Sequence, residues 1–279
     1  MKNNLYVMLS GGIGKHICFS SCLSKLEKIN IMSYWPKLFS NHPNVNYSYY
    51  LDWVPTADRT SFFNKFDEIK LIEGYDPYFY QNKIHLVENF RRITNFPLGQ
   101  DIYNEIYFTE NEEKDLSKLL PQLEEFVLVQ FMGADETNLE TDFIGSRGLI
   151  KEQAQKIINI LNFDLKLNVL NVFSTIDHFE NTTKIDFPLD YMIYANLLRY
   201  AKGFIGIDSC LNHMSANKFC DTKGVVLWND ENVNERFSYK KNINITTNTP
   251  RVMRFDVNEV IDNFQKIRSN HDQTRRTER

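Results

Sequence analysis

One stretch of the sequence joins an apolar run to residues that could bind an anion. Residues 203–207 are mainly apolar, and Asp208, Ser209 and His213 follow where a helix is expected to begin. The first N–H groups of a helix lack partners within it, and the helix dipole is positive at that end. Phosphate is therefore a natural ligand, with His213 one turn further along. The same pattern also fits an ordinary capped turn of an α/β protein.

A glycine-rich turn near the start of the chain is the second candidate. Gly11, Gly12 and Gly14 lie between an apolar run and a helical pattern. A phosphate-binding P-loop needs Ser or Thr after its Lys, but His16 follows Lys15. A dinucleotide fingerprint needs a third glycine where Ile17 stands. The turn either brings backbone close to a ligand or simply lets strand and helix pack closely.

Other chemistry-bearing residues are scattered. Arg147 precedes a predicted helix and could grip a diphosphate with two hydrogen bonds, or could fix a loop. The sequence shows no paired carboxylates, metal-ligand spacing or nucleophile elbow. If the protein is an enzyme, we expect its chemistry to rest on positioning and charge stabilisation.

The elements that would position these residues alternate between strand and helix. Apolar strands are predicted at 5–9, 126–131, 167–173, 203–207 and 224–228, and helical periodicity follows at 15–28, 151–161, after Pro188 and at 257–267. This order predicts parallel sheets covered by helices. We place one domain at 1–122, a second at 123–268, and a disordered polar tail at 269–279.

Composition limits the class of protein. The chain has 279 residues, of which 42% are hydrophobic and 24% charged, with a net charge of −4. This composition is ordinary for a globular protein, and the net negative charge gives no excess of basic residues for binding nucleic acid. We find no signal-peptide or transmembrane pattern, and the four cysteines lack metal spacing, which favours reduced thiols and a cytoplasmic location. Peripheral membrane contact stays open.

Four stretches of the sequence together resemble a known family. They are the run from Ala201 to Ala216 around Asp208-Ser-Cys-Leu-Asn-His213, the pair Gln130-Phe-Met-Gly133 and Arg147-Gly-Leu-Ile-Lys-Glu-Gln, and the turn Ser10-Gly-Gly-Ile-Gly14. In this order they resemble the heptosyltransferase family of GT-B glycosyltransferases. The resemblance implies an α/β fold of two Rossmann-like domains whose parallel sheets face a central cleft. The acceptor would bind to the first domain and the nucleotide sugar to the second.

The resemblance also implies roles for individual residues. The donor diphosphate would be bound by Asp208, Ser209, Cys210, Leu211, His213 and Arg147. The donor ribose would be held by Asp177 or Glu180. Enzymes of this kind need no cofactor and no metal ion, since helix dipoles and a cation stabilise the leaving diphosphate. The partners would be a nucleotide sugar and a glycan or other hydroxyl acceptor.

The chain departs from the family pattern at two positions. Where the family usually has an acidic base after the glycine turn, this chain has Lys15 followed by His16. His16 is the better candidate for the base, because an unperturbed histidine has a pKa of about 6.5. Cys210 replaces the usual glycine after Asp208 and Ser209, which restricts the backbone beside the phosphate.

These observations predict a cytoplasmic, metal-independent glycosyltransferase. Two alternatives stay open: a catalytically silent module that binds a sugar nucleotide or phospho-ligand, and a transferase acting on modified DNA bases. The absence of a basic excess disfavours the DNA alternative.

Overall fold

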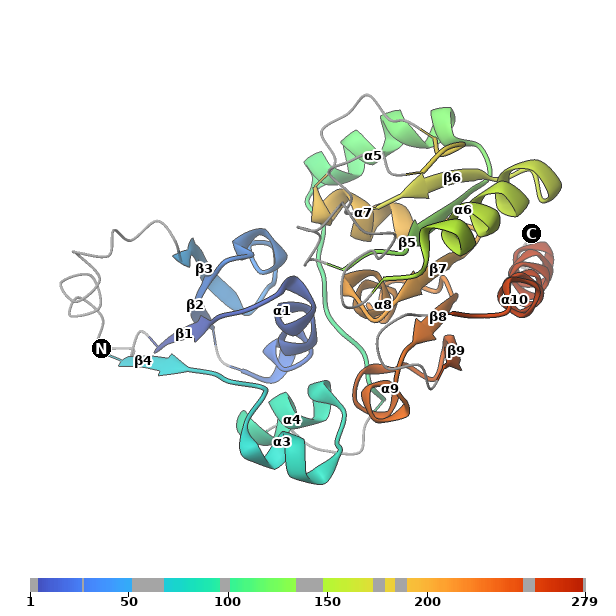
Figure 1. Ribbon diagram of the computed structural model, residues 1–279. Helices are drawn as coiled ribbons and strands as arrows, with labels where there is room; N and C mark the ends of the chain where they lie inside the picture. Colours follow the sequence, from blue (N-terminus) through green and yellow to red (C-terminus); the bar gives the residue numbers. More distant parts are fainter. Residues whose placement is uncertain are drawn as a thin grey trace. The chain divides into compact units, whose positions relative to one another are not determined.

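The computed structural model describes residues 5–26, 28–51, 68–95, 101–133, 148–172, 179–183, 190–247 and 254–277. The chain divides into two compact units. Unit 1 comprises residues 1–109 together with 217–219, and unit 2 comprises 110–216 and 220–279. The chain therefore leaves unit 2 after Ala216, contributes three residues to unit 1, and returns. Figure 1 shows the elements of both units.

Unit 1 is built on a parallel sheet. Its strands are β1 (Leu5–Leu9), β2 (Ile29–Ser33), β3 (Val45–Tyr50) and β4 (Glu68–Leu71), in the order β3-β2-β1-β4. The helices are α1 (Ile13–Ser20), α3 (Pro77–Asn82) and α4 (Leu86–Ile93), with short 3₁₀ turns at Leu23–Lys25 and Pro36–Leu38. Helices α1 and α4 pack together through an edge-to-face contact between Phe19 and Phe90, both fully buried.

A buried ionic cluster joins the 217–219 segment to the rest of unit 1. Glu105 is 1% exposed and accepts hydrogen bonds from His42 Nε2 at 3.0 Å and from Lys218 Nζ at 2.9 Å. Asn217 bonds the main chain of Ile106 through both ends of its amide. Burial raises the pKa of Glu105, but His42 and Lys218 outweigh it, so this pKa lies below its ordinary value.

Unit 2 has a second parallel sheet, in the order β6-β5-β7-β8-β9. The strands are β5 (Phe126–Gln130), β6 (Asn168–Asn171), β7 (Phe204–Ile207), β8 (Gly224–Trp228) and β9 (Ile243–Thr246). The helices are α5 (Glu110–Leu123), α6 (Lys151–Asn159, continued by a π turn at Ile160–Asp164), α7 (Tyr191–Leu198), α8 (Cys210–Ser215), α9 (Glu231–Phe237) and α10 (Val257–Thr277).

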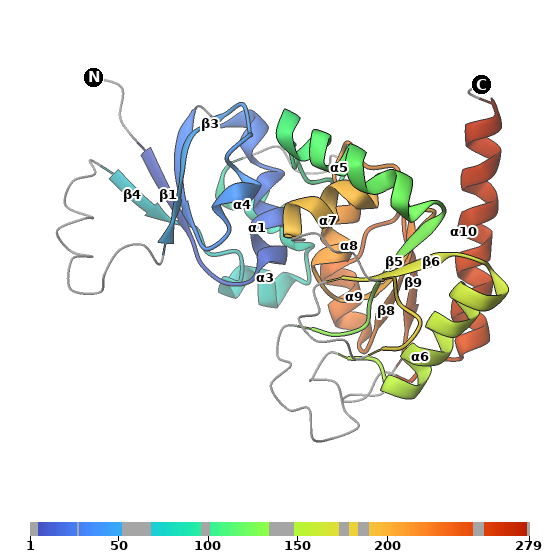
Figure 2. The same ribbon diagram turned by 90° about the horizontal axis from the view of Figure 1, so that it is seen from above.

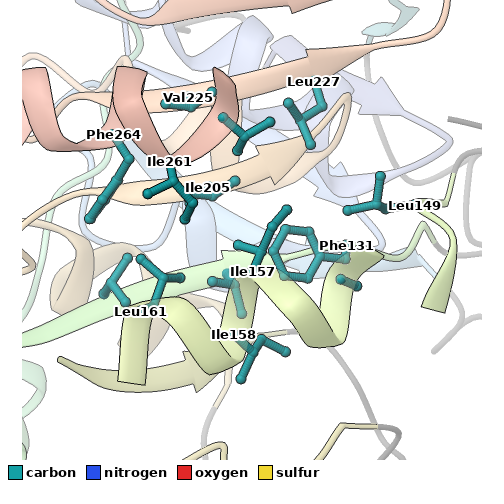
Figure 3. Packing of buried hydrophobic residues seen from close by; sticks show 14 of the residues in the cluster. Phe131, Leu149, Ile157, Ile158, Leu161, Ile205, Val225, Leu227, Ile261 and Phe264 are labelled. Carbon is teal, nitrogen blue, oxygen red and sulfur yellow. The ribbon is translucent and has the colours of Figure 1, made fainter. Parts of the chain in front are cut away.

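Helices cover both faces of the unit 2 sheet. Figure 2 shows α6 and α10 on one face and α5, α7 and α8 on the other. In the core of the first face, Ile157 of α6, Leu161 of the following π turn and Phe264 of α10 pack on Ile205 and Val225, all fully buried (Figure 3). Burying each large apolar side chain contributes about 1.5–3 kcal/mol, which explains why continuous apolar strands fold between two helical layers.

The observed elements confirm the predicted alternation of strands and helices, but several of their bounds differ from the prediction. The predicted boundary at 122 is wrong, because α5 belongs to unit 2, where Glu113 forms an ion pair with Arg199 of α7. The predicted tail at 269–279 is also wrong as a disordered segment, because α10 continues to Thr277. The first helix begins at Ile13 and ends at Ser20, and β3, α9 and β9 were not predicted. No helix in the described ranges is long and apolar enough to cross a membrane.

Candidate functional site

The strand order of unit 2 marks one place for a ligand. The chain passes from β5 to β6 on one side, and later to β7 on the other side of β5. Loops leaving the carboxyl ends of β5 and β7 therefore diverge, and ligands of open parallel sheets bind in the crevice at such a switch point. Gln130 ends β5, and Asp208 and Ser209 directly follow β7. The residues that predicted an anion site thus lie at this switch point.

Gln130 connects the two strands at that edge. Its Nε2 donates to Ser209 Oγ at 2.8 Å, and its Oε1 accepts from the Leu211 N–H at 3.1 Å. Gln130 is 3% exposed, so both ends of its amide are satisfied inside the protein. Because the Leu211 amide donates to Gln130, it is not available to a phosphate in this arrangement.

Polar side chains from the segment 239–242 hold helix α8, and Lys241 Nζ donates to the Ser215 carbonyl at its end at 2.6 Å. His213 Nδ1 lies 2.9 Å from the Tyr239 hydroxyl, and both residues are buried. Asn242 donates to Asn212 Oδ1 at 3.2 Å and to Ser215 Oγ at 2.9 Å. These contacts fix the orientation of the helix that follows Asp208 and Ser209.

Cys210 is packed inward at the start of α8. Its Sγ lies 3.5 Å from Gln130 Nε2, and the residue is 6% exposed. Burial raises the pKa of this thiol to about 11, so the thiol stays neutral at physiological pH. The Cys210 side chain packs against the Gln130 amide and contacts both of its ends.

Unit 1 has a switch point of its own. The chain runs from β1 to β2 and β3 on one side, and then to β4 on the other side of β1. Lys15 follows β1 in the first turn of α1, and Glu73 follows β4. Lys15 Nζ lies 2.7 Å from both Glu73 carboxylate oxygens. The Lys15 side chain is only 4% exposed, whereas that of Glu73 is 44% exposed.

The turn that carries Glu73 is rigidly supported. Gly74 leaves no room for a Cβ, because one would lie 2.5 Å from the Phe90 ring. Fully buried Asn89 donates to the Gly74 carbonyl at 2.7 Å and to Asp76 Oδ1 at 3.0 Å. Asp76 in turn caps α3 through the Phe79 N–H. Packing on α4 therefore fixes where Glu73 lies.

Several groups control the charge of Glu73. Partial burial raises the pKa of Glu73. Hydrogen bonds from Lys15 and the Tyr75 N–H, together with the Lys15 charge, lower this pKa by more than burial raises it. The net effect is a pKa below the ordinary value, so Glu73 is ionised at neutral pH. Lys15 Nζ also lies 5.4 Å from the centre of the Tyr75 ring.

Aromatic side chains lie beside this pair. Trp35, which follows β2, donates from Nε1 to the Gly11 carbonyl at 3.2 Å. Gly11 has φ +95°, a conformation that favours glycine, and a Cβ there would be 3.4 Å from the Lys15 side chain. Gly12, which precedes α1, has open space around it, and Gly14 lies in the first turn of the helix. Tyr75 is 37% exposed. The edge thus offers a carboxylate between partly exposed rings on which a sugar could stack.

His16 lies under the same turn but points into the unit. It is fully buried, with Nδ1 2.9 Å from the Gly12 carbonyl and Nε2 3.3 Å from the Leu9 carbonyl. Burial lowers the pKa of His16 despite these contacts, which favours the neutral ring. Each ring nitrogen faces a main-chain oxygen, so this conformation offers no nitrogen to a ligand.

Of the remaining predicted site residues, the structure describes one. Arg147 and Asp177 lie outside the described residues. Glu180 is exposed, and its main chain pairs with the Gln155 side chain on α6. Sequence reasoning overlooked Gln130, Glu73 and Tyr239 as site residues. The available signal was a polar residue at the end of an apolar strand for Gln130, and an acidic residue shortly after a strand for Glu73. Among the described residues, no group of three His, Cys, Asp or Glu could hold a metal ion.

Comparisons with known proteins agree on the fold. No protein family matches the sequence, and no curated protein is similar to it in sequence. A glycosyl transferase family 9 structure from Veillonella parvula is similar with a TM-score of 0.71 at 11% identity, covering 96% of this chain and 98% of that one.

Two heptosyltransferase structures are also similar. Escherichia coli WaaC with ADP has a TM-score of 0.67 at 12% identity, covering 95% of this chain and 99% of that one. The dodecameric iron-containing heptosyltransferase TibC, in complex with ADP-D-β-D-heptose, has a TM-score of 0.58 at 12% identity, covering 95% and 72%. These likenesses confirm the predicted α/β fold with two Rossmann-like units, as in GT-B glycosyltransferases. The predicted cleft concerns the relative placement of the units and stays a prediction.

Proposed function

We propose that this protein is a glycosyltransferase that moves a sugar from a nucleotide-sugar donor to a hydroxyl acceptor. The observation that carries the proposal is the unit 2 switch point, where Asp208, Ser209 and Gln130 meet at the carboxyl ends of β5 and β7. The fold supports it, because similar structures are heptosyltransferases, one holding ADP and another ADP-D-β-D-heptose.

The donor diphosphate would bind at the turn between β7 and α8. Asp208 and Ser209 form this turn, Cys210 and Leu211 begin α8, and His213 follows in the same helix. The Leu211 N–H would bind the diphosphate only by leaving Gln130, to which it donates in the structure. We add Gln130 to the set, since it determines the conformation of Ser209 and holds the Leu211 amide. Arg147 would offset the diphosphate charge, and Asp177 or Glu180 would bind the ribose.

The proposed reaction needs no metal ion and no cofactor. As the bond from the anomeric carbon to the diphosphate breaks, negative charge develops on the leaving oxygen. Fixed N–H groups and a guanidinium can stabilise that charge in place of a metal. The acceptor would be a glycan or another hydroxyl compound in the cytoplasm.

The first experiment is a donor screen. Purified protein is incubated with nucleotide sugars that differ in base and sugar, with and without a chelator and pooled acceptors, and donor consumption is followed by mass spectrometry. We expect one donor to be consumed, and chelator to leave the rate unchanged. Nucleotide binding without consumption of any donor would instead support a silent binding module.

A variant at the switch point tests the donor site. Asp208→Asn keeps the size of the side chain and removes its charge. If the Asp208 carboxylate holds the turn whose N–H groups bind the diphosphate, nucleotide affinity should fall about tenfold, or about 1.4 kcal/mol. Calorimetry measures the dissociation constant. Asp164→Asn, an exposed aspartate of the same unit, is the matched control. Equal affinity in both variants would contradict the proposed role of Asp208.

A further inference from the structure

We propose that Glu73 is the general base of the proposed transfer, and that Lys15 is its positioning residue. The inference rests on the proposed function and deepens it, because it assigns the group that receives the proton of the acceptor hydroxyl. It begins from a charge exchange. The family that this sequence resembles usually has an acid where Lys15 stands, and here Lys15 Nζ contacts a carboxylate from another strand.

The location of Glu73 supports this assignment. It follows β4, which neighbours β1 at the switch point of unit 1, and Ile72 still pairs with the Met8 carbonyl at 3.1 Å. The carboxylate of Glu73 is therefore delivered to the same sheet edge as the glycine turn. Unlike Lys15, it is 44% exposed in its side chain, so it can meet a hydroxyl group from solvent.

Neighbouring titratable residues are poorer candidates. Asp76 accepts from the Phe79 N–H and Asn89 on one oxygen and from Arg92 on the other. His16 is fully buried with both nitrogens against main-chain oxygens. Glu73 combines a fixed backbone, a charged partner and an exposed carboxylate, as a general base requires.

The chemical step is balanced without another reactant. A Glu73 oxygen accepts the proton of the acceptor hydroxyl while that hydroxyl oxygen forms a bond to the anomeric carbon of the donor. The bond between the anomeric carbon and the diphosphate oxygen breaks, and the nucleoside diphosphate leaves with the electron pair. Glu73 then returns the proton to solvent.

The decisive comparison uses two variants. Glu73→Gln is expected to lower kcat by about 100-fold to 10,000-fold, the usual contribution of a general base, with little change in donor affinity. It also leaves the buried Lys15 ammonium without its carboxylate. The double variant Lys15→Met with Glu73→Gln removes that charge, and we expect it to stay equally inactive. Glu110→Gln, whose side chain is 93% exposed, is the matched control.

Each result has a defined meaning. Recovery of turnover in the double variant would overturn the proposal, because the unpaired Lys15 charge would then explain the loss in Glu73→Gln. Full turnover of Glu73→Gln would overturn it directly. Circular dichroism and nucleotide affinity establish that the variants fold, and Glu73→Asp, which keeps a carboxylate, should retain more activity than Glu73→Gln. If the wild-type protein consumes no donor, the proposed function fails first and this assignment fails with it.

Discussion

The two units place polar groups at corresponding points of their sheets but use different interactions there. At the switch point of unit 1, Lys15 and Glu73 form an ion pair. At that of unit 2, Gln130 joins Ser209 and Leu211 through neutral hydrogen bonds. Ionic pairs respond to pH and salt, whereas amide hydrogen bonds do so much less. We expect the Lys15–Glu73 contact of unit 1 to depend on pH more strongly than the Gln130 contacts of unit 2.

The same contrast holds beyond the two edges. Unit 1 buries the cluster of His42, Glu105 and Lys218, while unit 2 holds α8 with Asn212 and Asn242. A buried charge that loses its partner costs several kcal/mol, but a lost neutral hydrogen bond costs less. Variants in the two units should therefore lower the free energy of unfolding by different amounts, and these losses should depend differently on pH.

The largest effect is expected at Glu105. Glu105→Gln removes the charge that pairs with Lys218, and we expect it to lower the free energy of unfolding by about 3 kcal/mol at pH 7. Because the pKa of Glu105 is lowered by folding, its contribution is full above the ordinary value of 4.5 and is lost as the pH falls through the folded-state value. Urea unfolding at pH 7 and at pH 3.5 measures both quantities.

The contrast between the two pH values is the critical outcome. The difference between wild type and Glu105→Gln should shrink at pH 3.5, because this pH lies below the ordinary pKa of 4.5 and the unfolded wild-type chain takes up a proton there. A difference that is the same at both pH values would show that the charge of Glu105 does not stabilise unit 1. Glu110→Gln serves as the control for a general effect of removing a carboxylate.

A smaller effect is expected at Gln130. Gln130→Leu leaves the Leu211 N–H and the Ser209 hydroxyl without their partner, which should cost about 2 kcal/mol of stability. Because no charge is involved, this cost should not vary between pH 6 and pH 8. Thermal unfolding measures it, and Gln122→Leu on the exposed face of α5 is the control. A strong pH dependence would break the proposed contrast between the units.

The smallest effect is expected at Lys15. Lys15→Met keeps the Glu73 carboxylate and removes the ammonium that holds this carboxylate in place. Because a poorly positioned base is less effective, we expect kcat/KM at pH 7 to fall about tenfold, or about 1.4 kcal/mol. The pKa of Glu73 should rise, since burial then acts without the opposing lysine. The acidic limb of the pH–rate profile should move to higher pH. An unmoved limb would mean that Lys15 does not control Glu73.

Much of the fold could be predicted because buried parallel strands are continuous apolar runs. The strands at Leu5–Leu9 and Gly224–Trp228 agree with the predicted bounds. In contrast, β3 carries exposed tyrosines without clear alternation, and α9 has no buried residue to give a helical period. The domain boundary was missed because α5 is amphipathic, and its sequence does not show which sheet it packs on.

Some members of the candidate site could be proposed from the sequence, and others could not. Asp208, Ser209 and His213 could be singled out because they follow a strand and begin a helix, which is a local signal. The pairing of Lys15 with Glu73 spans 58 positions and depends on β4 lying beside β1. The order of the strands in the sheet brings these residues together, and this order cannot be deduced from the spacing of residues in the sequence. His16 was favoured from its ordinary pKa, and its burial could not be read from the sequence.

The segment 217–219 has a consequence for how the protein is made. Unit 1 is completed by Asn217 and Lys218, which the ribosome adds about 110 residues after Thr109. At about 5–20 residues per second, unit 1 would wait roughly 5–20 s with Glu105 and His42 lacking Lys218. A nascent chain halted before residue 217 would hold an incomplete unit 1, so the first half of this protein depends for its final structure on residues from the second half.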